Sequence, residues 1–267
     1  MRLAFLGAGR MATALAAGLT RNGIMRAEDM VACDISDGAR SAFTRETGVI
    51  CTADPDERFG KAECVLLAVK PQNAADAVHG LHQAERDRLL ISIAAGVPLG
   101  QLEAWLGSRR VIRVMPNTPL LVGKGASVYS LGAGCREEDR AFCQTVFGSL
   151  GIVRQVHESW IDAVTALSGS GPAYFFEMVQ ALVEAAVEAG LPAELASELT
   201  VQTLDGAAAM LQRRMGTPDE LRRAVTSPGG TTAAGLAVLE AAGFRDLIRR
   251  MLTAARDRSI ELGRMHR

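Results

Sequence analysis

Two segments of this chain place glycines and hydroxyl side chains directly before sequence that is typical of helices. They are residues 167–174 (L-S-G-S-G-P-A-Y) and residues 226–232 (T-S-P-G-G-T-T). A glycine-rich turn at a helix N-terminus exposes backbone N–H groups at the positive end of the helix dipole, a combination that favours a carboxylate or a phosphate. We therefore expect both turns to contact a small acidic ligand.

The chain also opens with a dinucleotide-binding signature. The apolar run Leu3–Leu6 leads into G-A-G-R-M-A at residues 7–12, and helix-like sequence follows. In this pattern Gly7 permits the tight turn, Gly9 lets the backbone approach a pyrophosphate, and Ala12 allows close helix–strand packing. We predict that NADPH or NADH binds through Leu6, Gly7, Ala8, Gly9, Arg10 and Met11.

Asp34 lies at the end of the second predicted strand. A carboxylate at this point can accept hydrogen bonds from the ribose hydroxyls of NADH, and it repels the 2′-phosphate of NADPH. Arg40 could offset this repulsion, and Asp34 could instead cap the following helix together with Ser36 and Asp37. We favour ribose contact, with a preference for NADH or weak discrimination between the two cofactors.

Two further segments follow predicted strands and complete the expected cofactor site. They are Ala68, Val69, Lys70 and Pro71 at the end of the predicted strand 64–69, and Ala94, Ala95 and Gly96 after the predicted strand 89–93. Ligands of open α/β sheets bind at the carboxyl ends of the strands, and small residues there leave room for a nicotinamide ring. Lys70 could equally be a solvated loop lysine. Asn117, in the stiff two-proline turn 115–119, could hold backbone at this edge or serve the structure alone.

Composition and charge exclude several classes of partner. The four histidines (His79, His82, His157 and His266) and five cysteines are scattered without metal-ligand spacing, so we expect no metal site. Scattered cysteines in odd number are typical of a reducing compartment, and we expect a cytoplasmic protein. A net charge of −1 predicts no nucleic-acid partner. No segment approaches the roughly 18 uninterrupted apolar residues of a membrane helix, so we expect no membrane partner.

The elements that must position these residues are predicted from the spacing of apolar side chains. In the first part of the chain, short apolar runs alternate with helix-like segments, which predicts buried parallel strands in βαβ units. The predicted strands are 3–6, 30–33, 64–69, 89–93, 111–115 and 152–156, with an antiparallel strand at 126–131. The predicted helices between them are 10–22, 37–47, 72–86, 98–106 and 136–149.

After residue 158 the pattern is helical throughout. The predicted helices are 160–167, 173–189, 193–214, 219–225, 231–242 and 244–262. The fold class is therefore α/β plus all-α. A Rossmann domain, doubly wound around a mostly parallel sheet, is expected over residues 1–157, and an all-helical domain over residues 158–267. The helical half is rich in alanine and apolar residues and too short to cover itself, so we expect at least a homodimer.

Together these motifs resemble the Δ1-pyrroline-5-carboxylate reductase family over nearly the whole chain. The resemblance is carried by the F-L-G-A-G-x-M start, by segments 68–71, 94–96 and 111–119, and most specifically by residues 163–174 and 225–232. It implies reduction of 1-pyrroline-5-carboxylate to L-proline with NAD(P)H, the last step of proline biosynthesis. It also implies a helical substrate-binding and dimerisation domain, an interlocked homodimer, and often a decamer.

The resemblance also assigns roles to the second glycine-rich turn, because the family's contacts to the substrate carboxylate fall on Ser227 and residues 229–232. A cyclic imine needs a hydride at carbon, which the cofactor supplies, and a proton on nitrogen, so the protein supplies positioning and electrostatics. Thr232 could hydrogen-bond the ring nitrogen and relay a proton, and Thr232 and Ser227 are our catalytic candidates. The expected substrate contacts are Gly229, Gly230, Thr231, Ser170 and Gly171.

Two alternatives stay open at this point. A related reductase could act on another cyclic imino acid, pyrroline-2-carboxylate or piperideine-6-carboxylate, because motifs do not report pocket size. A catalytically silent nucleotide-binding regulator could keep the fold, although it would be expected to lose the S-P-G-G-T-T segment. Departures from the family pattern at Asp34, residues 52–56 and residues 214–218 leave open the cofactor preference, the adenosine contact, and the substrate or dimer contacts.

Overall fold

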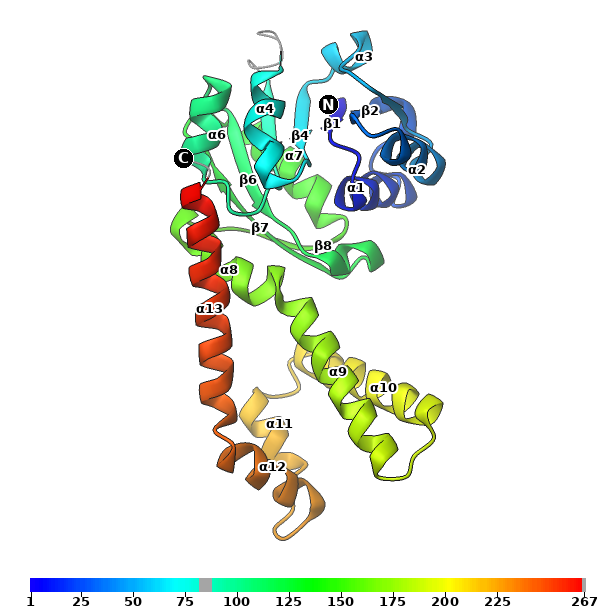
Figure 1. The fold of residues 1–267 in the computed structure, drawn as a ribbon, viewed down its shortest axis with the longest axis vertical. Helices are drawn as coiled ribbons and strands as arrows, with labels where there is room; N and C mark the ends of the chain where they lie inside the picture. The colour runs from blue at the N-terminus through cyan, green and yellow to red at the C-terminus, as the bar shows by residue number, and fades with distance from the viewer. Residues whose placement is uncertain (82–87, 266–267) are drawn as a thin grey trace. The chain divides into compact units, whose positions relative to one another are not determined.

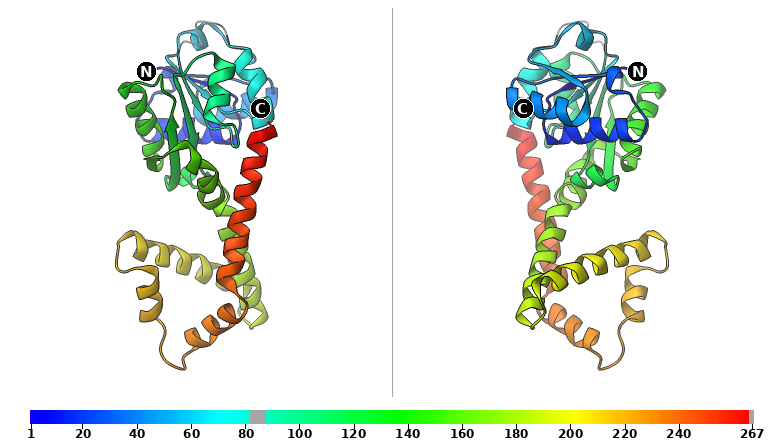
Figure 2. Two further views of the ribbon diagram at one scale, coloured as in Figure 1. Left: turned by 90° about the vertical axis from the view of Figure 1, so that its left-hand side faces the viewer. Right: turned by 90° about the vertical axis from the view of Figure 1, so that its right-hand side faces the viewer.

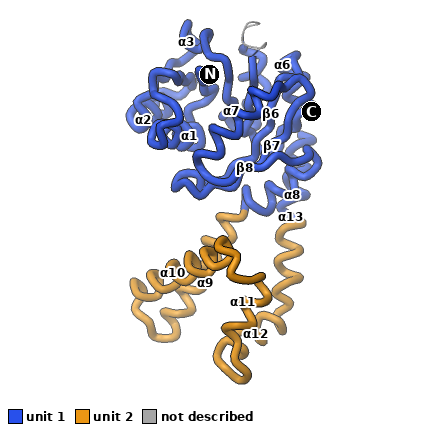
Figure 3. Tube along the Cα trace, turned by 180° about the vertical axis from the view of Figure 1, so that it is seen from behind, with its two compact units in different colours: residues 1–170, 254–267 blue, residues 171–253 orange. Residues whose placement is uncertain are grey.

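The computed structural model describes residues 1–81 and 88–265 of the chain. Its contacts divide the chain into two compact units, which Figure 3 draws in different colours. Unit 1 consists of residues 1–170 together with the C-terminal segment 254–267, and unit 2 consists of residues 171–253. The sequence analysis divided the chain differently, into a cofactor-binding domain at 1–157 and a substrate-binding and dimerisation domain at 158–267. That division by function remains a proposal.

Unit 1 is built around one eight-stranded sheet with the order β3-β2-β1-β4-β5-β6-β7-β8 (Figure 1). Neighbouring strands are parallel except β6 and β7, which are antiparallel. The order reverses at β1, which lies between β2 and β4, and this confirms the doubly wound, mostly parallel sheet. The strands are β1 (Leu3–Leu6), β2 (Met30–Cys33), β3 (Ile50–Thr52), β4 (Cys64–Leu67), β5 (Leu89–Ser92), β6 (Val111–Met115), β7 (Gly125–Leu131) and β8 (Gly151–Gln155).

Helices cover both faces of this sheet (Figures 1 and 2). Because side chains alternate along a strand, Leu3 and Phe5 pack with α1, α2 and α7, whereas Ala4 and Leu6 pack with α3, α4 and α6. Both clusters are closed to solvent, so unit 1 has a core on each side of the sheet. These helices are α1 (Arg10–Arg21), α2 (Asp37–Thr47), α3 (Glu57–Gly60), α4 (Ala74–His79), α6 (Leu99–Leu106) and α7 (Glu137–Gly148).

Three details of unit 1 differ from the sequence prediction or fall outside it. The strand predicted at 152–156 was expected to be buried, but β8 pairs only with β7 in the described part of the chain, and Ile152 is 60% exposed. The short, partly exposed β3 is missing from the predicted apolar runs. The predicted helix 72–86 begins with the 3-10 turn Pro71–Asn73 and continues as α4, and its residues 82–86 lie outside the described residues. His82 and His266 also lie outside them.

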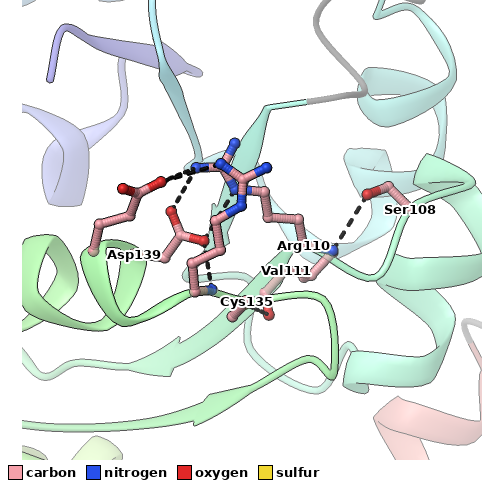
Figure 4. Close-up of polar contacts among 7 residues, drawn as sticks. Ser108, Arg110, Val111, Cys135 and Asp139 are labelled. Atoms are coloured by element: carbon pink, nitrogen blue, oxygen red, sulfur yellow. Dashed lines mark hydrogen bonds and ion pairs between the residues drawn. The ribbon is translucent and has the colours of Figure 1, made fainter.

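The start of β6 is fastened to α7 by a buried ion pair (Figure 4). Arg110 donates from Nη2 to Asp139 Oδ1 at 2.7 Å and from Nε to Oδ2 at 3.0 Å, and Arg136 N donates to the same Oδ2 at 2.9 Å. Burial alone would raise the pKa of Asp139, but these hydrogen bonds and the arginine charges outweigh it and hold the pKa below its ordinary value of 3.8. Burial also raises the pKa of the neighbouring Cys135 thiol to about 11, so this thiol stays protonated at neutral pH.

The chain between the sheet and unit 2 changes helix type twice. A 3-10 turn (Glu158–Trp160) is followed by α8 (Ile161–Val164) and then by the π-helical turn η5 (Thr165–Gly169), where a single helix 160–167 had been predicted. Hydroxyl groups compete with the α-helical pattern here, since Thr165 Oγ1 donates to Ile161 O at 2.8 Å and Ser168 Oγ donates to Val164 O at 3.1 Å. The widened turn is closed by Ser170 N, which donates to Thr165 O at 2.8 Å.

Unit 2 is entirely helical, as predicted. It contains α9 (Gly171–Glu188), α10 (Ala193–Gln212), α11 (Pro218–Ala224), α12 (Thr231–Ala241) and the first part of α13 (Phe244–Met265), whose last turns belong to unit 1. The start of α11 is a capping box, in which Glu220 N donates to Thr217 Oγ1 at 3.3 Å and Thr217 N donates to Glu220 Oε2 at 2.7 Å. Among the described residues, no helix is long and apolar enough to cross a membrane.

Unit 2 buries almost none of its own apolar side chains. Within residues 171–253, which are all described, only Gly171 and Ala196 are buried. Phe175 is 54% exposed and Phe176 is 69% exposed on α9, and Val238 is 68% exposed on α12. An apolar surface of this extent marks an interface rather than a free surface.

Candidate active site

The segments predicted to bind the cofactor meet at one edge of the sheet. Gly7 N donates to Cys33 O at 2.8 Å, Ala68 N donates to Leu6 O at 2.8 Å, and Ile93 N donates to Leu67 O at 3.1 Å. These bonds extend the β2–β1–β4–β5 pairing past the carboxyl ends of the strands, at the point where the strand order reverses. The structure therefore brings together the turns that follow these four strands, at the place where open α/β sheets bind ligands.

Gly7 and Gly9, in the turn after β1, have different surroundings. Gly7 has a φ of +103°, and an added Cβ would lie 2.9 Å from the Ala68 carbonyl carbon and from Val69 N, so any side chain would collide with the backbone after β4. Gly9 is exposed, and an added Cβ would meet no atom within 4 Å. The backbone after β4 therefore packs closely on Gly7, whereas the space next to Gly9 is open to solvent.

The N-terminus of α1 faces this open space. Gly9 is its N-cap residue, without a side-chain capping bond, and the first intrahelical bond runs from Thr13 N to Gly9 O at 3.0 Å. The N–H groups of residues 10–12 therefore have no acceptor within the helix and carry the positive end of its dipole. This donor set fits a dinucleotide pyrophosphate.

Asp34 is held in place by two backbone N–H groups. Its Oδ2 accepts from Ala8 N and its Oδ1 accepts from Ser36 N, both at 2.8 Å. The N-cap of α2 is Ser36, whose Oγ accepts from Ala39 N at 3.3 Å, so Asp34 is not itself the capping residue. The Asp34 carboxylate is thus hydrogen-bonded to the turn after β1, at Ala8, and is held at the end of β2.

Two neighbours of Asp34, Arg40 and Ile35, would influence which nucleotide can bind there. Arg40 donates from Nη1 to Asp34 O at 2.9 Å and to Ile35 O at 3.0 Å, and its Nη2 donates to Asp37 Oδ1 at 3.0 Å, so its guanidinium is occupied by the protein. Ile35 is 89% exposed. The sequence analysis did not single out Ile35, although its place directly after Asp34 is visible in the sequence.

The turn after β5 is covered by the end of α13. Gly96 has a φ of +77°, and a Cβ added at Gly263 would lie 2.9 Å from Gly96 O, so the two backbones are in contact. Ser259 Oγ on α13 donates to Asp162 Oδ1 at 2.7 Å. Ala94 and Gly96 are buried, whereas Lys70, in the turn after β4, is exposed.

A buried arginine on β6 is linked, through Glu158, to the start of α6, which follows the turn after β5. Arg113 is 4% exposed, and its Nη1 donates to Glu158 Oε1 at 2.6 Å. The same oxygen accepts from Leu99 N at 3.0 Å, at the start of α6. Neither residue was singled out from the sequence, since neither has a local pattern that reveals its partner.

The turn 226–232 lies wholly in unit 2 and opens onto the N-terminus of α12. Gly229 has a φ of +68°, Gly230 N donates to Ser227 O at 3.1 Å, and a Cβ at Gly230 would collide with Ser227 Oγ. Ala234 N donates to Gly230 O at 3.1 Å, so the N–H groups of residues 231–233 have no acceptor within the helix. Thr231 and Thr232 are exposed. This donor set fits a carboxylate.

Asn117 holds backbone at the end of β6, which is one of the two roles expected for it. Its Nδ2 donates to Ser168 O at 3.0 Å, and its Oδ1 accepts from Ala126 N at 2.8 Å. The bond to Ser168 links the sheet to the segment 167–174, just before Ser170 and Gly171. No group of three His, Cys, Asp or Glu side chains that could hold a metal ion occurs among the described residues.

Comparison with known proteins matches both parts of the chain. Residues 158–262 match the family model for pyrroline-5-carboxylate reductase dimerisation, and residues 2–96 match that for coenzyme F420-dependent NADP oxidoreductases. Pyrroline-5-carboxylate reductase from Pisum sativum is 42% identical, with 97% of this chain and 95% of that protein covered. The reductase from Pseudomonas aeruginosa is also 42% identical, with 98% and 96% covered.

This chain belongs to the pyrroline-5-carboxylate reductase family. Solved structures of the family agree in fold along the whole chain. The Plasmodium falciparum pyrroline carboxylate reductase with NADP bound has a TM-score of 0.90 at 32% identity, and 98% of each chain is covered. The reductase from Coxiella burnetii has a TM-score of 0.88 at 37% identity, again with 98% of each chain covered.

Membership of the family accounts for the exposed apolar side chains of unit 2. The matched dimerisation region, 158–262, contains all the helices on which these side chains lie. The protein therefore oligomerises, and the exposed apolar side chains of unit 2 lie in the region that matches the dimerisation model.

Proposed function

We propose that this protein reduces 1-pyrroline-5-carboxylate to L-proline by hydride transfer from NAD(P)H. The observation that carries the proposal is the turn 226–232, which presents the N–H groups of residues 231–233 at the N-terminus of α12 in a chain that also has a dinucleotide site. A cyclic imino acid carries one carboxylate and one reducible C=N bond, and these two features match the two sites.

The cofactor would be held by the edge of the sheet around β1. The N–H groups of residues 10–12 would bind the pyrophosphate, Asp34 would accept from the ribose hydroxyls, and Ile35 would offer an apolar surface to the adenine. Residues 68–71 and 94–96 would border the nicotinamide, which supplies the hydride when bound. The crowding at Gly7 and the open space at Gly9 support this placement.

The substrate would be held mainly by unit 2. The backbone N–H groups of Thr231 and the two residues after it would bind the carboxylate. Gly229 and Gly230 would leave space beside it, and Ser227 would close the turn by accepting from Gly230 N. Thr232 Oγ1 would donate a hydrogen bond to the nitrogen of the neutral imine and relay a proton to it from solvent, or would accept from the N–H of the imine that is already protonated. Ser170 and Gly171 would shape the wall of the pocket. No strong acid is needed, because a protonated imine already accepts hydride.

Asp34 favours NADH over NADPH in this proposal, or allows weak discrimination. The carboxylate would face a 2′-phosphate with like charge, and Arg40 is engaged by backbone carbonyls and Asp37 rather than available to offset it. We expect Asp34→Ser to move the NADPH/NADH ratio of kcat/KM upward by about tenfold, on the scale of one close charge contact. Unchanged discrimination in this variant would contradict the role of Asp34.

The assembly is proposed to be a homodimer built through residues 158–262, with a decamer as a higher assembly. The protein is also proposed to act in the cytoplasm, without nucleic-acid or membrane partners. Static light scattering of the purified protein at micromolar concentration tests the assembly, with two chains per particle, or ten, as the expected results. A monomer would contradict the proposal.

The reaction is tested by following the oxidation of NADH and of NADPH in parallel with 1-pyrroline-5-carboxylate, with proline quantified as the product. Pyrroline-2-carboxylate and piperideine-6-carboxylate serve as matched alternative substrates, because they change ring size or the position of the carboxylate. Faster turnover of either would reassign the substrate. Cofactor binding without turnover of any imine would favour a catalytically silent nucleotide-binding regulator.

A further inference from the structure

The π-helical turn η5 directly precedes the residues expected to shape the substrate pocket. Single π turns are rare within helices and occur frequently at functional sites. We propose that Asn117 is a positioning residue for this turn: its side-chain amide holds residues 165–169 in the π conformation and thereby places Ser170. The proposal rests on the proposed function, because it concerns the placement of that substrate site.

The first argument is the hydrogen-bond requirement of Ser168. In an α-helix its carbonyl would accept from the N–H of residue 172, but residue 172 is proline and has no N–H. Asn117 Nδ2 donates to this carbonyl instead, at 3.0 Å. A side chain from the end of β6 therefore replaces the donor that the sequence of the turn has removed.

The second argument is the way Asn117 is itself fixed. The residue is 7% exposed, and its Oδ1 accepts from Ala126 N on β7 at 2.8 Å. The amide oxygen of Asn117 is therefore hydrogen-bonded to the sheet, and its amide nitrogen is hydrogen-bonded to the turn. Ser168 is therefore held from two sides, by its own hydroxyl bond to Val164 in α8 and by the bond from Asn117, which ties its carbonyl to the sheet.

A third contact supports the same placement. Gly169 packs directly on Met115, the last residue of β6, and a Cβ added at Gly169 would collide with Met115 Cε. The absence of a side chain at residue 169 thus lets the turn lie against the strand. Two residues of the β6 end, Met115 and Asn117, hold two consecutive residues of the turn.

The sharpest test is Asn117→Asp, which keeps an oxygen for Ala126 N but replaces the donor with a carboxylate facing Ser168 O. At pH 8 we expect kcat/KM for 1-pyrroline-5-carboxylate to fall about 30-fold, as displacements near 1 Å do at reacting sites. The dissociation constant of NADH, measured by fluorescence titration, should stay within about twofold because the cofactor turns are untouched. The introduced carboxyl group can donate again once it is protonated, so the ratio to wild type should rise as pH falls from about 8 to about 5.5.

Thr47→Val is the matched control. Thr47 is also 7% exposed, and its Oγ1 donates to Phe43 O at 2.7 Å and accepts from Val49 N at 3.1 Å, so it too joins two backbone groups. It lies at the other end of the sheet, before β3. We expect it to lower the melting temperature about as much as Asn117→Asp while leaving kcat/KM and its pH profile unchanged.

Hydrogen exchange separates this proposal from the proposed function. In Asn117→Asp, the amides of residues 169–171 should exchange faster than in wild type, and in Thr47→Val they should not. A wild-type protein without turnover would contradict the function, and the exchange rates would still decide the role of Asn117. Unchanged exchange, or a loss of activity that does not recover at low pH, would overturn the proposal.

A second pair of variants covers the case in which Asn117→Asp fails to fold. The end of the Met115 side chain can move away from a single methyl, so the test uses Gly169→Val, whose branched side chain also approaches Thr165. Gly169→Val should push the turn away from β6 and lower kcat/KM, and Gly169→Val combined with Met115→Ala should recover part of the loss by opening the space. If the double variant is no better than Gly169→Val alone, the turn is not positioned by the end of β6 and the proposal is wrong.

Discussion

Units 1 and 2 are drawn from the same chain but are stabilised in different ways. Unit 1 buries two apolar clusters, one on each face of its sheet, and side chains such as Phe5 and Leu66 are fully excluded from solvent. Unit 2 buries only Gly171 and Ala196 within its own residues. Unit 1 therefore has a core of its own, whereas unit 2 leaves its apolar side chains exposed, and we propose that another copy of the chain covers them.

This difference separates two kinds of substitution. A change in unit 1 acts on the stability of the single chain and on cofactor binding, because its packing partners are in the same chain. A change on the apolar surface of unit 2 acts on assembly, and it affects activity through assembly because the proposed substrate turn lies in this unit. The following variants test the comparison.

Phe176→Glu is expected to have the largest effect. Phe176 is 69% exposed on α9, and a carboxylate at a buried interface would be left without a partner. We expect dissociation into monomers and a loss of activity greater than about 100-fold, since breaking such contacts costs several kcal/mol. Light scattering and NADH titration should show lost assembly with retained cofactor binding. Phe176→Leu is the control and should remain assembled, and an assembled, active Phe176→Glu would contradict the comparison.

Asp139→Asn is the corresponding variant in unit 1. Removing the carboxylate that pairs with the partly exposed Arg110 should destabilise the chain by about 2 kcal/mol at pH 7, on the scale of hydrogen bonds to a charged group, while assembly is retained. Because the folded-state pKa of Asp139 is lowered, its contribution is present above the ordinary aspartate pKa of 3.8 and is lost as pH falls through the lowered value.

Urea unfolding at pH 7 and at pH 3 measures the effect of Asp139→Asn. The difference from wild type should shrink at the lower pH, and a difference that is constant with pH would show that the ion pair is not its cause. Glu138→Gln serves as the control, since Glu138 is 56% exposed and should change stability by less than about 1 kcal/mol.

Thr232→Ala tests the proposed chemistry in unit 2. We expect kcat/KM to fall by about 10–100-fold with unchanged folding and assembly, on the scale of one polar contact at a reacting centre. Thr200→Ala is the matched control, since Thr200 Oγ1 bonds only within α10, to Ala196 O at 2.7 Å. Unchanged kinetics in Thr232→Ala would remove the residue from the mechanism.

Gly9→Ala has the smallest expected effect and isolates the ligand. An added methyl meets no protein atom within 4 Å, so the melting temperature should stay the same. The dissociation constant of NADH should rise about tenfold, because the methyl would occupy the space of the pyrophosphate. Gly7→Ala, where the methyl meets backbone, should instead lower stability. If Gly9→Ala binds NADH as wild type does, the pyrophosphate lies elsewhere.

The sequence predicted the elements well where their signals are local. Ser36 was considered as part of a cap for the helix predicted at 37–47 and is the N-cap of α2, and the helix predicted at 219–225 is α11, which begins at the Thr217 capping box. The glycine-rich turn 7–12 was predicted from its own spacing, which permits a tight turn and close helix–strand packing. These signals lie within a few residues of the feature they predict.

Contacts between distant residues could not be predicted in the same way. Asn117 and Ser168 are 51 positions apart, Arg113 and Glu158 are 45 apart, and Ser259 and Asp162 are 97 apart. Each of these pairs forms only because the sheet and helices bring together side chains that have no common local pattern. Pro172 is a partial exception, since its missing N–H already indicates that Ser168 needs a donor from elsewhere.

The return of α13 to unit 1 has a consequence for the order in which the protein is completed. The sheet is encoded before residue 156, so it can fold while the rest of the chain is being synthesised. Gly263, which contacts Gly96, is synthesised only after the sheet and the helices of unit 2. The turn that is proposed to border the nicotinamide therefore reaches its final packing only once α13 has been made, so a nascent chain that stops before α13 has the sheet but lacks the segment that covers this turn.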